Sequence, residues 1–196
     1  TLDILDSLGI AHVGTYRNQE ERDSLYPYIT TTNGIRCAIL NYTYGTNGIS
    51  VNPPCIVNYI DTTQILKDIN KARIKKADVI IACMHWGNEY VLKQNREQEQ
   101  LADWLIENGV DHIIGSHPHV IQPTDIREDK FDSGYHFIAY SLGNYISNMS
   151  AKHTDIGIAV TLNMSKRLFT TGLTGIMVDT IRTDRKGFIL RPMKQK

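Results

Sequence analysis

Two hydrophobic patterns alternate along the chain, namely apolar residues at helical spacing and short continuous apolar runs. Helical spacing predicts amphipathic helices, whereas runs of about four to eight residues bounded by turn residues favour strands. The run at 78–84 is uninterrupted, which is typical of a strand covered on both faces. The expected elements are helices at 2–8, from 61 onward and at 96–108, and strands at 35–42, 78–84, 110–115 and 137–140.

Local signals support the ends of these helices. The segment Asp61-Thr62-Thr63-Gln64 has the form of a capping box if Asp61 is the N-cap residue. Gly9 and Gly109 stand where helices commonly stop. The side chains expected on the inward faces of the second and third helices are Ile65, Leu66, Ile69, Ala72, Leu101, Trp104 and Leu105.

The order strand, helix, strand between residues 78 and 115 indicates where a site would lie. A single crossover helix is expected to make the two strands parallel, with a right-handed connection. Their carboxyl ends then share one edge of the sheet, which is where open α/β sheets bind ligands. We therefore expect His85, His117 and His119, which follow these two strands, to converge at that edge.

The C-terminal part of the chain has a different pattern. Segments 156–162, 175–183 and 187–190 are predicted to be antiparallel strands that supply a sheet and not the chemistry. A chain of 196 residues fits one domain, and no repeat or linker divides it, so residues 1–196 are expected to form a single α/β domain or part of one.

Composition removes several classes of function. Acidic and basic residues are equal in number, so nothing in the charge calls for nucleic acid or an anionic membrane surface. No apolar run is long enough to cross a bilayer, and Thr1-Leu2-Asp3 lacks the features of a signal peptide. Without an initial Met, the chain looks cut from a longer one. Cys37, Cys55 and Cys83 lack C-x-x-C spacing, which argues against a thiolate zinc site.

The histidines carry the candidate chemistry, because imidazole is a common ligand of zinc, manganese and iron. Pro118 biases the preceding residue toward extended conformations, and in an extended segment His117 and His119 would face the same side. A divalent metal site from His85, His117 and His119 is therefore predicted. The remaining histidines are expected to be surface or hydrogen-bonded residues, namely His12, His112, His136 and His153.

Four further residues are weaker candidates, each with an ordinary alternative. Glu89 could orient an imidazole or act as a catalytic acid or base, or it could be an exposed loop carboxylate. Trp86 could form a wall of the binding cleft or simply pack in the core. Ser141 and Asn144 could bind a substrate, although Ser-Leu-Gly-Asn is also good turn chemistry.

Together, the motifs resemble the CapA-type capsule-synthesis family, which has a fold like that of calcineurin-type metallophosphoesterases. The resemblance covers most of the chain, and the combination of motifs is specific although each alone is weak. The matching stretches are Thr1-Leu2-Asp3 to Tyr16-Arg17-Asn18, 41–48, Met84-His85-Trp86-Gly87-Asn88-Glu89-Tyr90, Gly115-Ser116-His117-Pro118-His119 and Tyr140-Ser141-Leu142-Gly143-Asn144-Tyr145.

The resemblance implies a two-sheet sandwich flanked by helices. It also implies that His85 matches the lone late histidine of the metallophosphoesterase pattern, while His117 and His119 match its final His-x-His pair. Ser116 departs from that pattern, which usually has Gly before the pair. The motifs for an Asp ligand, a bridging acid and an Asn-His element would lie upstream of Thr1, so we expect an incomplete sandwich and a partial site for Mn, Zn or Fe.

The function implied by the resemblance is synthesis of poly-γ-glutamate or another envelope polymer, with metal-assisted attack on a phosphoester, acyl phosphate or amide. Two alternatives stay open: a general phosphoesterase, and a non-catalytic component of polymer assembly or export. The expected partners are an anionic polymer or a phosphorylated or acyl substrate, and other capsule-synthesis proteins. The expected location is the cell envelope, at the outer face of the bacterial membrane.

Overall fold

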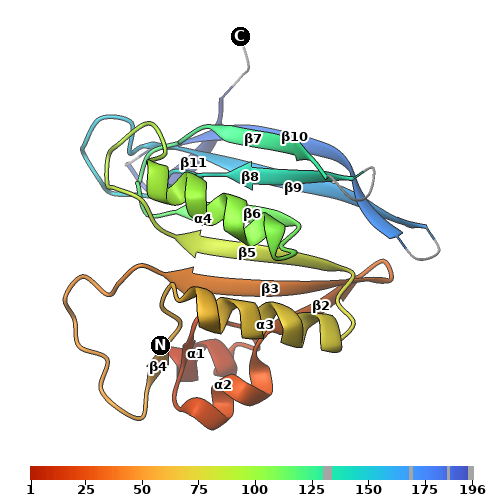
Figure 1. The fold of residues 1–196 in the computed structure, drawn as a ribbon. Coiled ribbons are helices and arrows are strands. Elements are labelled where there is room, and N and C mark those ends of the chain that lie inside the picture. The colour runs from red at the N-terminus through yellow and green to blue at the C-terminus, as the bar shows by residue number, and fades with distance from the viewer. Residues whose placement is uncertain (130–133, 168–169, 185, 194–196) are drawn as a thin grey trace. The chain divides into compact units, whose positions relative to one another are not determined.

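The computed structural model of the chain describes residues 1–129, 134–167, 170–184 and 186–193. The fold divides into two compact units, Thr1–His85 and Trp86–Lys196. Figure 1 draws the helices and strands of both units. The assignment of residues 1–196 to one domain stays a prediction.

The first unit is built on β2 (Tyr28–Thr32), β3 (Ile35–Thr43) and β5 (Val79–His85). β2 pairs antiparallel with β3, and β3 pairs parallel with β5. The crossover between the parallel pair includes α3 (Thr62–Ile74), which lies along β3 (Figure 1). The smaller elements of this unit are α1 (Leu2–Ser7), β1 (Thr15–Tyr16), α2 (Gln19–Leu25) and β4 (Ile56–Val57).

Helix α3 confirms Asp61 as its N-cap, whereas the Gln64 side chain donates to Asp68 Oδ1 at 3.1 Å and does not complete the predicted capping box. The helix also corrects one predicted core position. The Asp61 carboxylate accepts hydrogen bonds from the backbone N–H groups of Thr63 and Gln64, at 2.8 and 3.1 Å. Leu66 was expected inward but is 37% exposed. The buried stripe instead passes from Ile65 through Asp68. Three residues make about 300° of helical turn, so Asp68 shares the face of Ile65 while Leu66 is turned about 100° away.

The predicted first helix is present, but it is not packed as its leucine spacing suggested. Gly9 has φ +66° just beyond the helix end, as expected of a stop. No residue of α1 is buried, and Leu8 lies at the C-cap and is exposed. Leucine spacing indicates an amphipathic helix, but whether anything covers that face depends on distant residues.

The second unit contains β6 (His112–Ser116), β7 (Thr124–Glu128) and β8 (Tyr135–Ala139). β8 pairs parallel with β6 and antiparallel with β7. Helix α4 (Arg96–Glu107) begins with a complete capping box between Asn95 and Gln98. Of its predicted inward residues, Leu105 is fully buried, whereas Leu101 and Trp104 are half-buried.

A second, antiparallel sheet completes this unit. β9 (Ile156–Arg167), β10 (Thr170–Asp184) and β11 (Ile189–Pro192) are ordered β11-β10-β9 and confirm the strands predicted in the C-terminal part of the chain. β10 contacts β8, and an isolated bridge joins Gly143 to Gly157. The α/β class is therefore confirmed: each unit contains both parallel and antiparallel strand pairs, and the second unit also has an antiparallel sheet.

The expected parallel pairing of the strand before His85 with the strand before His117 concerns β5 and β6, which belong to different units, so it stays a prediction. In the part of the chain that the structure describes, no helix has the length and apolar character needed to cross a membrane.

Candidate metal centre

Two loops of the second unit form the site, and backbone hydrogen bonds tie them together. The loop before α4 carries Glu89, and the loop after β6 carries His117 and His119. The Trp86 N–H donates to the Ser116 carbonyl at 3.1 Å, and the Tyr90 N–H donates to the Pro118 carbonyl at 2.8 Å. Because Tyr90 directly follows Glu89, the second bond sets the glutamate beside the two histidines.

The His117-Pro118-His119 segment is not extended, so that prediction is wrong. His117 has φ +101° and His119 has φ +60°, both in the left-handed region that non-glycine residues rarely adopt. The chain turns immediately after β6, where the Pro118 carbonyl accepts the Tyr90 N–H. Such conformations cost about 1–3 kcal/mol each and persist only where the surrounding structure imposes them.

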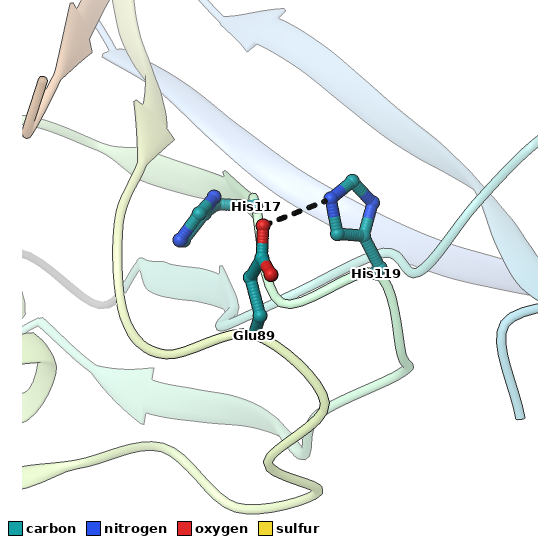
Figure 2. Close-up of side chains that lie close together, drawn as sticks. All are labelled: Glu89, His117 and His119. Atoms are coloured by element: carbon teal, nitrogen blue, oxygen red, sulfur yellow. Dashed lines mark ion pairs between the residues drawn. The ribbon is translucent and has the colours of Figure 1, made fainter. Parts of the chain in front are cut away.

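The turn nevertheless brings the two imidazoles together with Glu89 (Figure 2). Glu89, His117 and His119 each offer one ligand atom, and these atoms all lie within 4.8 Å of one another. The His119 Nε2 atom is 3.7 Å from the Glu89 Oε1 atom. The two histidine ring centroids are 6.1 Å apart, with 55° between the ring planes. Among the described residues, this is the one group of three or more such side chains that could hold a metal ion.

The three ligand candidates differ in exposure. His117 is only 8% exposed, whereas the side chains of His119 and Glu89 are 31% and 44% exposed. Burial lowers the pKa of His117, the neighbouring Glu89 opposes that shift and the neighbouring His119 adds to it. A lowered pKa keeps the His117 imidazole neutral near pH 7, which is the form that binds a metal.

The far side of His119 contacts Asn144, a residue predicted to bind substrate. His119 Nδ1 lies 3.0 Å from Asn144 Oδ1. The Tyr90 ring stacks on His119 with 6.1 Å between ring centroids and 30° between ring planes. The sequence pointed to Tyr90 only as the last residue of the motif Met84-His85-Trp86-Gly87-Asn88-Glu89-Tyr90 and assigned it no role.

His85 is the last residue of β5 and therefore belongs to the first unit. Its ring stacks on Tyr44, with 5.9 Å between centroids and 6° between planes, and its carbonyl accepts the Tyr44 N–H at 3.0 Å. Its position at a strand end agrees with the expectation, and its role as a ligand beside His117 stays a prediction.

The side chains of Trp86 and Ser141 are buried. The Trp86 Nε1–H donates to the Tyr140 carbonyl at 2.9 Å, and the two rings stack at 6.1 Å between centroids. The Ser141 hydroxyl donates to the Val120 carbonyl at 2.7 Å and accepts the N–H of the residue two positions later. Both side chains thus hold the backbone around the site, and their contact with a substrate stays a prediction.

A pair of buried glutamines, which sequence reasoning missed, secures the Glu89 loop. Gln98 Nε2 donates to Gln122 Oε1 at 2.9 Å. Gln122 Nε2 in turn donates to the carbonyls of Val91 and Lys93, at 2.9 and 3.1 Å. The capping-box spacing from Asn95 could have indicated Gln98, whereas no local pattern indicates Gln122.

The amino-acid sequence is similar to a family of bacterial capsule-synthesis proteins. A sequence profile described as Bacterial capsule synthesis protein PGA_cap matches residues 1–149. Capsule biosynthesis protein CapA of Bacillus anthracis is 31% identical over 152 residues, which cover 74% of this chain and 35% of that protein. PGA biosynthesis protein CapA of Bacillus subtilis strain 168 is 31% identical over 137 residues, which cover 68% and 34% of the two chains.

A solved structure supports the fold. A 5′-nucleotidase precursor from Thermus thermophilus aligns with a TM-score of 0.54 at 13% sequence identity, covering 91% of this chain and 34% of that one. The fold is therefore metallophosphoesterase-like, as the motifs implied. The chain spans about a third of the length of the curated relatives it matches. Because the profile match extends over residues 1–149, the chain belongs to the bacterial capsule synthesis protein family PGA_cap.

Proposed function

We propose that the chain takes part in the synthesis of a poly-γ-glutamate capsule and that Glu89, His117 and His119 hold a divalent cation for this purpose. The observation that carries the proposal is the convergence of these three side chains within 4.8 Å. The names of the Bacillus relatives, which refer to capsule and PGA biosynthesis, support the polymer. His85 is proposed as a further ligand from its motif and its place at the end of β5.

The residues present fit such a cation. Two imidazoles and a carboxylate form a ligand set that catalytic zinc sites use, and it leaves coordination positions for water or substrate. Ligand bonds of about 2.0–2.2 Å allow one ion to bridge atoms up to about 4 Å apart. The 3.7 Å between His119 Nε2 and Glu89 Oε1 lies within that span. All the ligand atoms lie within 4.8 Å of one another, so binding one ion needs at most a small closing movement of these side chains.

A divalent ion in such a site supplies Lewis acidity and lowers the pKa of a bound water. The protein's own residues prepare for this in different ways. Buried His117 stays neutral because burial lowers its pKa, and so it offers a lone pair. Glu89, the most exposed of the three, is placed to bind the ion or to move a proton at its carboxylate. The bond from Tyr90 N–H to the Pro118 carbonyl keeps the two loops in register.

The proposed substrate is an anionic polymer or a phosphorylated or acyl compound, with a phosphoester, acyl phosphate or amide as the bond that reacts. Other capsule-synthesis proteins are proposed as partners, and the proposed location is the outer face of the bacterial membrane. These proposals are supported by the family and by its capsule-related relatives.

The test replaces histidines in the full-length protein, in a strain whose polymer output depends on it. His117, His119 and exposed His153 all have positive φ, so Asn, which tolerates this region, is the matched substitution at each. His117→Asn and His119→Asn are expected to abolish polymer output and to reduce the metal content of the purified protein. His153→Asn should change neither. Unchanged polymer output and metal content in the first two variants would contradict the proposal.

A second candidate function is hydrolysis of simple phosphate esters, which the likeness of the fold to a 5′-nucleotidase supports. Turnover of nucleoside monophosphates by the metal-loaded full-length protein would favour it. Inertness toward such esters with Mn, Zn and Fe, alongside metal-dependent polymer synthesis, would favour the capsule proposal.

A further inference from the structure

We propose that Asn144 is a positioning residue, which holds His119 in the tautomer protonated on Nδ1 and thereby presents Nε2 as the ligand atom. This inference rests on the proposed metal site, and it assigns a role to a contact between residues 25 positions apart. The contacts that carry it connect the Asn144 amide to the His119 ring, and that ring to Glu89.

The orientation of the Asn144 amide follows from its partners. Its Nδ2 lies 3.0 Å from the Thr154 carbonyl oxygen, which only accepts hydrogen bonds, so this amide atom must be the donor nitrogen. Nδ2 also donates to the Ser147 hydroxyl at 3.2 Å. Thr154 is fully buried, and its hydroxyl and N–H both donate to the Ala151 carbonyl, so the carbonyl that anchors Asn144 belongs to a tight turn.

With Nδ2 engaged in this way, Oδ1 is the atom that faces His119. An amide oxygen only accepts, so the His119 Nδ1 atom at 3.0 Å must carry a proton. A neutral imidazole has a single N–H group, which leaves a lone pair on Nε2. That lone pair lies 3.7 Å from Glu89 Oε1, another acceptor (Figure 2). Two acceptors face each other at the place where a cation would attract both.

The neighbours of His119 also restrict its rotation. Tyr90 stacks on the ring while Asn144 binds Nδ1 from the edge. Tyr90 is itself fixed by its N–H bond to the Pro118 carbonyl. Removing the partner that orients a ligating histidine typically costs about 10- to 100-fold in metal affinity.

The test uses the 196-residue chain with three substitutions and two measurements. The substitutions are Asn144→Leu, which removes the acceptor, Asn144→Asp, which keeps it, and Asn148→Leu, which makes the same change at an exposed position of the same loop. Zn²⁺ affinity is measured by competition with a chromophoric chelator. The His119 tautomer is read from ¹⁵N shifts of the metal-free protein at alkaline pH, where imidazole is neutral. Circular dichroism confirms that each variant is folded.

We expect Asn144→Leu to mix the His119 tautomers and to weaken Zn²⁺ binding about 10- to 100-fold. Asn144→Asp and Asn148→Leu should keep the Nδ1–H tautomer, with affinity within a few-fold of wild type. If Asn144→Leu leaves both the tautomer and the affinity unchanged, the inference is overturned while the metal site stands. If wild type binds no Zn²⁺, the proposed metal site is wrong. The control of the His119 tautomer by Asn144 then stands only if the ¹⁵N shifts of His119 still change in Asn144→Leu. Should that variant not fold, a Nε2–H tautomer in wild type or in Asn144→Asp would overturn the inference.

Discussion

Buried His112 is expected to make the folded protein less stable as the pH falls from 7 to 5. This residue of β6 is 2% exposed, and its Nδ1 accepts the Phe137 N–H at 3.2 Å. Burial, together with the nearby charge of His136, lowers its pKa from 6.5 to about 4. Protonation of the folded state would also break the bond from Phe137, because Nδ1 would become a donor.

The sign and size of the effect follow from the two pKa values. Above pH 6.5 neither state binds a proton at this position, and between pH 6.5 and about 4 only the unfolded chain does. Proton uptake therefore stabilises the unfolded state progressively as the pH falls through this window. The linkage relation gives a loss of about 2 kcal/mol in the free energy of unfolding between pH 7 and pH 5.

The assay is urea denaturation of wild type and His112→Asn at the two pH values. Asn offers an acceptor oxygen near the position of Nδ1 but does not titrate, so the variant should lose about 2 kcal/mol less than wild type over this interval. Other carboxylates and histidines titrate in both proteins, and the comparison cancels their contribution. Equal losses in the two proteins would refute the argument that burial keeps His112 neutral.

Substitutions at three further positions test the packing around the site and, in the first unit, an ion pair and a helix cap, each by urea denaturation followed by circular dichroism. Gly115→Ala should lower the free energy of unfolding by about 1–3 kcal/mol, because the added Cβ would lie 2.0 Å from the Tyr140 carbonyl oxygen. A variant as stable as wild type would contradict this and show that β6 can shift to make room. Asp68→Ala should lower the free energy of unfolding by about 3–5 kcal/mol. The Asp68 carboxylate lies 2.7 Å from the buried Arg22 guanidinium, and the substitution leaves that charge unpaired. A loss below about 1 kcal/mol would contradict this. Asp61→Ala should cost about 1 kcal/mol through loss of the α3 cap, whereas Asp61→Ser should restore most of it.

The elements were predictable where local rules decide them. The run at 78–84 became β5, because residues that bury both faces of a strand leave a continuous hydrophobic signal. The largely apolar stretch 35–42 became β3. Asp61 predicted the start of α3, because a cap is a contact between near neighbours in sequence. Short or exposed elements such as β2 and β7 were missed, since half-exposed strands with polar residues carry a weak pattern.

The side chains that meet at the candidate site were largely predictable, whereas their backbone geometry was not. The residue types and their places after strands indicated His117 and His119, and the motif pointed to Glu89. The left-handed backbone of His117 contradicted the local rule for residues before proline, and His119 is left-handed as well, because contacts with the Glu89 loop impose the turn.

What the sequence by itself determined is the set of strands and helices with strong local signals, two of the three side chains that meet at the candidate site, and the family. Tertiary structure alone decided which partner each functional side chain meets, such as Asn144 for His119 and Gln98 for Gln122. The physical reason is that these contacts join segments about 25 residues apart, and a hydrogen bond of about 3 Å depends on the final packing of both segments. No periodicity or spacing within either segment encodes that distance.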